Sequence, residues 1–119
     1  MMPVTSVGRI DLQSSQSFAA LSGDFNPQHL DPAKARRLLF GGTVVHGIHL
    51  LLIGLDVALA ARPGVRALVS LKAVFSAPVL TGSSVRVEIE RASADTETIL
   101  LTSGGRPCRR SAGWLNYRR

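Results

Sequence analysis

The chain has 119 residues, of which 45% are apolar and 18% are charged, and its formal net charge is +6. This length fits one compact domain, residues 1–119, and the apolar content excludes a mainly disordered chain. The single cysteine, Cys108, excludes an intrachain disulfide and a thiolate-rich zinc module, and it favours a reducing, cytoplasmic location.

Taken in chain order, the sequence predicts one strand, two short helices and one long helix before residue 62. These segments are the strand 7–12 and the helices 14–21, 33–38 and 46–61. Gly23 is expected to end the first helix, because glycine adopts a left-handed backbone at little cost. The dipeptides Asn26-Pro27 and Asp31-Pro32 bias the backbone away from helical geometry, so residues 22–32 are expected to form a structured loop.

The most apolar run, residues 44–61, is long enough to raise the question of a membrane helix. Two glycines weaken it, and three polar side chains interrupt it: His46, His49 and Asp56. We therefore expect a helix buried in a soluble domain, because a helix that is apolar on nearly all sides is usually enclosed by protein. Residues 1–6 lack the apolar core of a signal peptide, and no membrane contact is expected.

Beyond residue 66 the hydrophobic period changes from helical to alternating. The expected strands are residues 67–75, 84–90, 97–102 and 108–117, with a bend at 77–78. In the second of these strands, Val85, Val87 and Ile89 lie on one face and polar residues on the other, which is typical of a sheet that faces water on one side. A long apolar helix packed against, and partly wrapped by, an antiparallel sheet makes an α+β domain.

The positive charge is concentrated near the C-terminus. Residues 101–119 contain five arginines and no acidic residue, whereas residues 1–100 carry nine basic and eight acidic side chains. Such a segment is typical of solvated charges, of contact with a phosphorylated ligand or an acidic carrier protein, or of nucleic-acid binding. Because only Trp114 and Tyr117 are aromatic there and no recognised binding motif surrounds them, nucleic-acid binding is not expected.

The densest set of functional residue types lies in the 22–32 loop. Asp24 and His29 are five positions apart across a proline-braced turn and can converge on one water, with the carboxylate accepting a proton and the imidazole orienting or relaying it. Alternatively, Asp24 and Asp31 cap turns through side-chain to backbone hydrogen bonds, and His29 is a surface histidine. The spacing alone leaves both interpretations open.

A second candidate site is the segment 43–47, directly before the long helix. The free N–H groups of a helix start favour negative charge near Gly47, and a glycine lets a ligand carbonyl approach closely. Alternatively, this glycine serves helix packing only, and His46 is expected to be structural. His46 and His49 have no obvious third ligand nearby, so no metal site is expected. Cys108 has no histidine near it in sequence and is a weak nucleophile candidate.

Two segments of the chain together resemble a known family. Residues 18–32, FAALSGDFNPQHLDP, and residues 40–47, FGGTVVHG, resemble the signature of the MaoC-like dehydratases and (R)-specific enoyl-CoA hydratases in residue identity, order and spacing. The resemblance implies a hot-dog fold, a long helix wrapped by an antiparallel sheet, in a homodimer whose sheets join edge to edge. It also implies hydration of trans-2-enoyl thioesters, or dehydration of (R)-3-hydroxyacyl thioesters, without a metal or organic cofactor.

Carried over position by position, the resemblance assigns roles to individual residues. It implies that Asp24 and His29 form the catalytic acid–base pair, that Asn26 belongs to the same motif loop, and that the backbone N–H of Gly47 holds the thioester carbonyl. The acyl-pocket candidates, which are apolar residues of the same two segments, are Phe25, Leu30 and Phe40.

The chain departs from some relatives at Leu55, where they carry a serine that supports the acid–base pair. The expected substrate is an acyl-CoA or an acyl carrier protein thioester, and either would suit the basic C-terminal segment. Two competing functions stay open. One is a hot-dog acyl thioesterase, in which a carboxylate activates water against the thioester carbonyl, and the other is a non-catalytic acyl-binding hot-dog subunit.

Overall fold

The computed structural model describes residues 4–64, 67–75, 77–91, 93–103 and 110–118. The helices are α1 (Leu12–Ser22), α2 (Pro27–Leu30), α3 (Pro32–Ala35) and α4 (Gly47–Ala60). The strands are β1 (Val4–Arg9), β2 (Ala67–Phe75), β3 (Ser84–Arg91), β4 (Thr96–Ser103) and β5 (Arg110–Arg118). The expected α+β class is confirmed.

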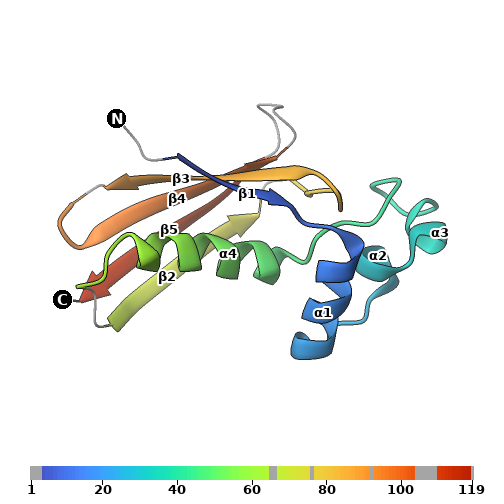
Figure 1. The fold of residues 1–119 in the computed structure, drawn as a ribbon, viewed down its shortest axis with the longest axis horizontal. Helices are drawn as coiled ribbons and strands as arrows, with labels where there is room; N and C mark the ends of the chain where they lie inside the picture. Colours follow the sequence, from blue (N-terminus) through green and yellow to red (C-terminus); the bar gives the residue numbers. More distant parts are fainter. Residues whose placement is uncertain (1–3, 65–66, 76, 92, 104–109, 119) are drawn as a thin grey trace.

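The five strands form one antiparallel sheet in the order β1-β3-β4-β5-β2. The long helix α4 lies along one face of this sheet, and α1, α2 and α3 gather near its N-terminal end, on the right in Figure 1. In the centre of the sheet, Val87 pairs with Leu101 and Ile89 pairs with Ile99. One long helix covered by an antiparallel sheet is the hot-dog architecture that the sequence resemblance implied.

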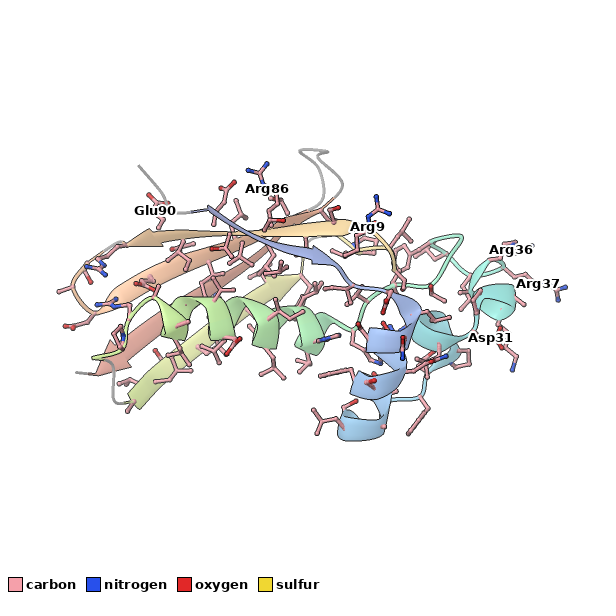
Figure 2. The ribbon with its side chains drawn as sticks, in the orientation of Figure 1. Arg9, Asp31, Arg36, Arg37, Arg86 and Glu90 are labelled. Atoms are coloured by element: carbon pink, nitrogen blue, oxygen red, sulfur yellow. The ribbon has the colours of Figure 1, made fainter. Side chains whose placement is uncertain are left out.

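Side chains of β3 alternate between the core and the outer face of the sheet. Val85 and Val87 are fully buried and Ile89 nearly so. Arg86 and Glu90 are exposed and point away from α4 (Figure 2). This confirms the two faces expected from the sequence, and it places the apolar face of the sheet against the helix.

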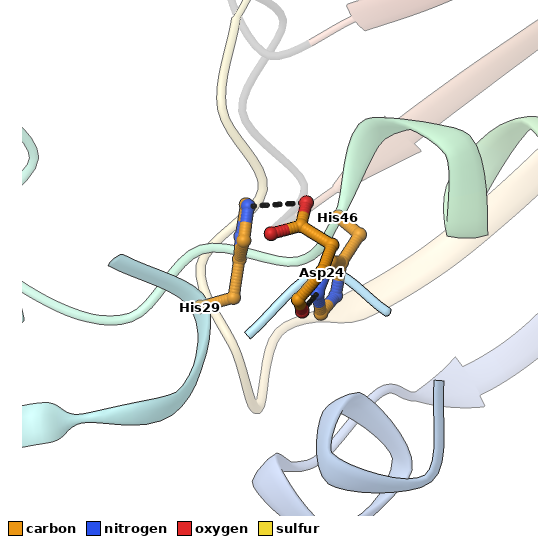
Figure 3. Close-up of side chains that lie close together, drawn as sticks. All are labelled: Asp24, His29 and His46. Carbon is orange, nitrogen blue, oxygen red and sulfur yellow. Dashed lines mark hydrogen bonds and ion pairs between the residues drawn. The ribbon is translucent and has the colours of Figure 1, made fainter. Parts of the chain in front are cut away.

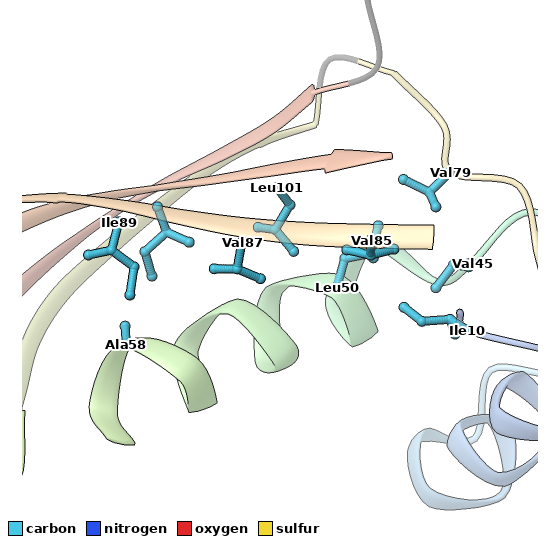
Figure 4. Packing of buried hydrophobic residues seen from close by; sticks show 10 residues of the cluster. Ile10, Val45, Leu50, Ala58, Val79, Val85, Val87, Ile89 and Leu101 are labelled. Carbon is cyan, nitrogen blue, oxygen red and sulfur yellow. The ribbon is translucent and has the colours of Figure 1, made fainter. Parts of the chain in front are cut away.

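The hydrophobic core fills the space between α4 and the sheet. Leu50 and Ala58 of α4 are buried against strand side chains that include Leu101 and Ile89 (Figure 4). At Gly54, a Cβ atom would lie 3.1 Å from Leu101 Cδ1 and 3.3 Å from Ile99 Cγ2. Close packing on β4 thus accounts for a glycine in the middle of this apolar helix. Within the described ranges, no helix combines the length and hydropathy needed to cross a membrane.

The C-terminal end of α4 is joined to the sheet by a buried ion pair. Arg62 Nη1 donates to Glu97 Oε1 at 2.9 Å, and both side chains are less than 5% exposed (4% and 3%). Arg62 Nη2 also donates to the carbonyl of Ala94. These bonds fix the end of the helix that lies far from α1, α2 and α3.

Boundaries in the N-terminal third differ from the expected ones because capping side chains set them. Asp11 accepts a hydrogen bond from the Ser14 N–H and begins α1 at Leu12, so β1 ends at Arg9 instead of continuing to residue 12. The 22–32 loop was expected to lack a helix, and this was wrong. Asn26 caps α2, and Pro27 takes the first helical position, where its missing N–H costs no hydrogen bond.

The C-terminal expectations are tested only in part. The backbone of β5 pairs with β4 and β2, which supports a last strand in this region. Residues 104–109 and 119 lie outside the described residues, and so do Cys108 and three of the five C-terminal arginines: Arg106, Arg109 and Arg119.

Candidate active site

Short polar side chains hold the loop between α1 and α2. Gly23 ends α1 with φ at 81°, as expected. The Asn26 N–H donates to Asp24 Oδ1 at 3.1 Å, and the Gln28 N–H donates to Asn26 Oδ1 at 3.1 Å. One oxygen of the Asp24 carboxylate is therefore used by the turn, while the other, Oδ2, faces His29.

His29 presents a defined nitrogen to Asp24. Its Nδ1 lies 2.8 Å from the carbonyl oxygen of Val44. Because a carbonyl only accepts hydrogen bonds, Nδ1 carries a proton, and Nε2 is the ring nitrogen left to face Asp24. This nitrogen is 3.7 Å from Asp24 Oδ2 (Figure 3). The His29 side chain is 10% exposed and that of Asp24 is 51% exposed, so a buried imidazole faces a carboxylate that remains open to solvent.

Each of the two interpretations of the 22–32 loop accounts for part of its geometry. Asp24 both caps a turn and faces an imidazole, so each interpretation describes one of its oxygens. Asp31 caps α3 by accepting from the Lys34 N–H at 3.1 Å. His29 is buried and is not the surface histidine of the capping interpretation. The geometry brings Asp24 and His29, the acid–base candidates, together, whereas Asp31 caps α3.

A third side chain, His46, contacts both members of the pair. Its Nε2 lies 3.0 Å from the backbone carbonyl of Asp24, and its ring stacks on His29 with centroids 4.0 Å apart. Phe18 lies 4.9 Å from His46 and stacks on His49 at 4.5 Å. We call these four rings the ring column. The column connects α1, α2 and the start of α4.

The far end of the ring column is electrostatically neutral near neutral pH. Burial lowers the pKa of His49 below its usual value of 6.5, and the neighbouring His46 lowers that pKa further. Because a protonated imidazole is disfavoured there, His49 contributes to the column as an uncharged ring.

Asp24, His29 and His46 are the one group in the described ranges whose potential metal-ligand atoms lie together, within 4.8 Å of one another. The ligand lone pair of an imidazole lies in the plane of its ring. The planes of His29 and His46 differ by 24° and their centroids are 4.0 Å apart, so their lone pairs lie in two stacked, nearly parallel planes. This stacked arrangement suits hydrogen bonding and proton transfer better than convergence on one ion.

Gly47 is the first residue of α4, and its N–H is one of the first-turn amides that have no acceptor inside a helix. A Cβ atom at Gly47 would lie 3.1 Å from Cε1 of the Phe75 ring. An open pocket of about 320 Å³ adjoins this residue; it is lined by Phe40, Val45, Gly47, Leu50, Phe75, Ala77 and Pro78. The start of α4 therefore combines a free backbone donor with an apolar cavity.

The pocket contains one of the three apolar candidates expected from the sequence. Phe40 lines it, whereas Phe25 is 61% exposed and Leu30 is half-buried, and neither is among the lining residues. Sequence reasoning missed Phe75 and Pro78. They lie far from both motifs, and the one local signal, the Ala-Pro pair after the strand, indicated only a bend.

Asn26 and Leu55 have structural surroundings. The Asn26 side chain caps α2 and thereby shapes the motif loop. Leu55 lies on α4, half-buried against the hydrophobic core. The position where some relatives carry a supporting serine is thus occupied here by a packing residue.

Residues 2–100 match the family model described as the MaoC like domain. The chain belongs to this family. Over 97 residues it is 35% identical to the (R)-specific enoyl-CoA hydratase of Aeromonas caviae, covering 75% of this chain and 72% of that protein. The hot-dog fold and the family resemblance inferred from the sequence are confirmed.

Solved structures of R-hydratases resemble this MaoC-like domain along nearly its whole length. The (R)-hydratase from Aeromonas caviae involved in PHA biosynthesis superposes with a TM-score of 0.73 at 28% identity, covering 99% of this chain and 95% of that one. The R-hydratase PhaJ1 from Pseudomonas aeruginosa superposes with a TM-score of 0.72 at 25% identity, covering 98% of this chain and 77% of that one.

Proposed function

We propose that the chain hydrates trans-2-enoyl thioesters to (R)-3-hydroxyacyl thioesters and catalyses the reverse dehydration, with Asp24 and His29 as its acid–base pair. Family membership and the identity to an (R)-specific enoyl-CoA hydratase support the reaction class, that of a lyase. The observation that carries the residue assignment is the 3.7 Å separation between Asp24 Oδ2 and His29 Nε2.

Hydration needs an activated water at the β-carbon, a proton for the α-carbon and stabilisation of the enolate oxygen that develops between these events. In the proposed reaction, Asp24 Oδ2 accepts a proton from water as the hydroxyl bonds to the β-carbon. His29 Nε2 orients that water, and the proton taken up by Asp24 then passes to the α-carbon, directly or through His29 Nε2, so that Asp24 is again a carboxylate. The bond from Nδ1 to Val44 supports this role because it leaves Nε2 as the nitrogen that faces Asp24.

The start of α4 supplies the third requirement. In this proposal the Gly47 N–H holds the thioester carbonyl, where a preorganised donor stabilises the developing enolate. The largely apolar lining of the adjacent pocket suits an acyl chain, with Phe40 at its wall. Each step uses donors and acceptors of the chain itself, so neither a metal nor an organic cofactor takes part in the proposed chemistry.

A homodimer with sheets joined edge to edge is part of this proposal. The edge strand β2 has exposed side chains on both of its faces. Val69, Val74 and Phe75 are at least half exposed there, and α4 exposes Ile48 and Leu52. An exposed apolar edge strand invites pairing with another chain, and a second copy of this chain would cover it.

The remaining expectations stay predictions. The substrate carrier is expected to be CoA or an acyl carrier protein, without a nucleic-acid or membrane partner. The cytoplasmic location expected from the single cysteine also remains a prediction.

The test is turnover of a short trans-2-enoyl-CoA by the purified chain, followed by loss of the conjugated thioester absorbance and by the stereochemistry of the product. We expect the (R)-3-hydroxyacyl-CoA. Release of free CoA without hydration would favour the thioesterase. The absence of reaction with several chain lengths and with an acyl carrier protein thioester would favour the non-catalytic acyl-binding subunit.

A further inference from the structure

His46 connects the Asp24 loop to a distant part of the chain. It is 2% exposed, and its Nε2 lies 3.0 Å from the Asp24 carbonyl, 22 residues earlier in the sequence. Since the carbonyl is an acceptor, Nε2 carries the proton and donates. Among the described residues, the other hydrogen bonds of segment 22–26 join positions two to four apart. The His46 bond is therefore the long-range hydrogen bond of this segment.

The same imidazole limits the orientation of His29. The Nδ1 bond to the Val44 carbonyl fixes one point of the His29 ring. The face of that ring stacks on His46 at 4.0 Å with 24° between the planes, which limits its tilt about that point. One buried side chain thus contacts both groups that the proposed reaction requires to converge.

The backbone around His46 bears the other parts of the site. Val44, two residues earlier, supplies the carbonyl that holds His29. Gly47, the next residue, begins α4 and carries the N–H assigned to the thioester carbonyl. A shift of His46 would therefore disturb the geometry between the acid–base pair and this donor.

We propose that His46 is a positioning residue for the reaction. Its imidazole donates through Nε2 to the Asp24 carbonyl and stacks on His29, and so holds the Asp24 carboxylate and His29 Nε2 in place relative to the Gly47 N–H. In this proposal it acts through Asp24 and His29 and does not bind the substrate itself. This role goes beyond the structural one expected from the sequence, and it rests on the proposed function.

The test replaces the donor and the ring separately. His46→Phe keeps a flat ring and loses the donor, whereas His46→Gln keeps an amide donor near the position of Nε2. We expect kcat for a short trans-2-enoyl-CoA to fall about 10- to 100-fold in His46→Phe, because small displacements of reacting groups are costly. KM should stay close to the wild-type value, since His46 does not bind substrate. His46→Gln should recover most of the lost kcat.

The matched control is His49→Phe, the same substitution at the other end of the ring column. His49 stacks on Phe18 and does not contact the Asp24 carbonyl in the described structure. We expect wild-type kcat for this variant. Wild-type kcat in a folded His46→Phe protein, or an equal loss in both Phe variants, would overturn the proposal.

If His46→Phe does not fold, the test compares kcat of His46→Gln with kcat of His46→Asn. The shorter asparagine amide does not reach the Asp24 carbonyl, so only the glutamine variant keeps this hydrogen bond. Higher kcat in the glutamine variant supports positioning, and equal kcat overturns it.

A second readout needs no substrate. The 13C chemical shift of the Asp24 carbonyl reports its hydrogen bond, and it should move in His46→Phe and stay in place in His49→Phe. A wild-type chain without hydratase activity would overturn the proposed function. The 13C shift of the Asp24 carbonyl would then test only whether His46 positions Asp24. An unchanged shift in His46→Phe would overturn this part of the proposal as well.

Discussion

The two ends of α4 are held by different kinds of interaction. Along the sheet and at its C-terminal end, the helix is fixed by buried apolar side chains and by the enclosed Arg62–Glu97 pair. At its N-terminal end, the neighbouring elements are joined by stacked rings and by single hydrogen bonds from imidazoles to backbone carbonyls. In the first region the Arg62 and Glu97 side chains are enclosed, whereas in the second the Asp24 carboxylate stays half exposed.

This difference separates the interactions that stabilise the fold from the groups available for chemistry. Apolar burial supplies most of the driving force for folding, and it resides between α4 and the sheet. The two four-residue helices α2 and α3 are too short to be stable alone and depend on their caps and on packing. We call α4 and the sheet the body of the fold. Substitutions in the body should therefore change stability first, and substitutions in the site around Asp24 and His29 should change turnover first.

The largest effect on stability is expected at the buried ion pair between Arg62 and Glu97. Arg62→Met leaves the Glu97 carboxylate buried without this partner, and breaking such a pair costs about 3–5 kcal/mol. Urea unfolding would measure the loss. At a temperature where the variant stays folded, kcat for the enoyl thioester should match the wild type, because the pair lies at the end of α4 away from the site.

Arg91→Met is the control for this pair. The Arg91 side chain is 56% exposed and its Nε lies 3.9 Å from Glu97 Oε1, so its removal should cost no more than about 1 kcal/mol. The double variant Arg62→Met with Glu97→Leu should recover much of the stability lost in the single variant. Equal losses in the two arginine variants would contradict the division between enclosed and exposed charge.

A smaller effect is expected from His49, where the site meets the core. Its pKa is lowered in the folded chain, so between that value and about 6.5 the unfolded chain binds the proton more readily. The free energy of unfolding should therefore decrease as the pH falls through this window. In His49→Phe this contribution is absent, and the decrease should be shallower.

Urea unfolding at about pH 7.5 and at about pH 5.5 would measure both slopes. The difference between wild type and variant isolates His49, because both chains retain His29 and His46. Identical slopes would show that burial of this imidazole does not couple folding to pH.

The body of the fold could be predicted well because its sequence pattern follows burial directly. The strand expected at residues 84–90 is observed as Ser84–Arg91, and the apolar helix expected at 46–61 is observed as Gly47–Ala60. Val85 and Val87 face the core as their alternation indicated. Contact of one face of β3 with the core sets this alternation, and such contact leaves a regular pattern in the sequence.

Only those site residues that belong to a local sequence motif could be predicted from the sequence. Asp24 and His29 were singled out by residue type and spacing, but the spacing left open whether Asp24 caps a turn or faces the histidine. The structure shows one oxygen in each position. Phe75 at the pocket and the bond from His46 to the Asp24 carbonyl depend on contacts between distant segments. A single sequence has no pattern that reports which atom a buried imidazole meets.

The central claim is that Asp24 provides a base through the oxygen that the turn does not use. The most direct measurement compares Asp24→Asn with Asp31→Asn in hydration of the same short trans-2-enoyl-CoA, at matched folded fraction. Both changes keep the shape and a capping oxygen, but only the first removes a carboxylate beside His29. We predict that turnover falls about 100-fold or more in Asp24→Asn and stays near the wild-type rate in Asp31→Asn. Wild-type turnover in Asp24→Asn, or an equal fall in both variants, would contradict the account.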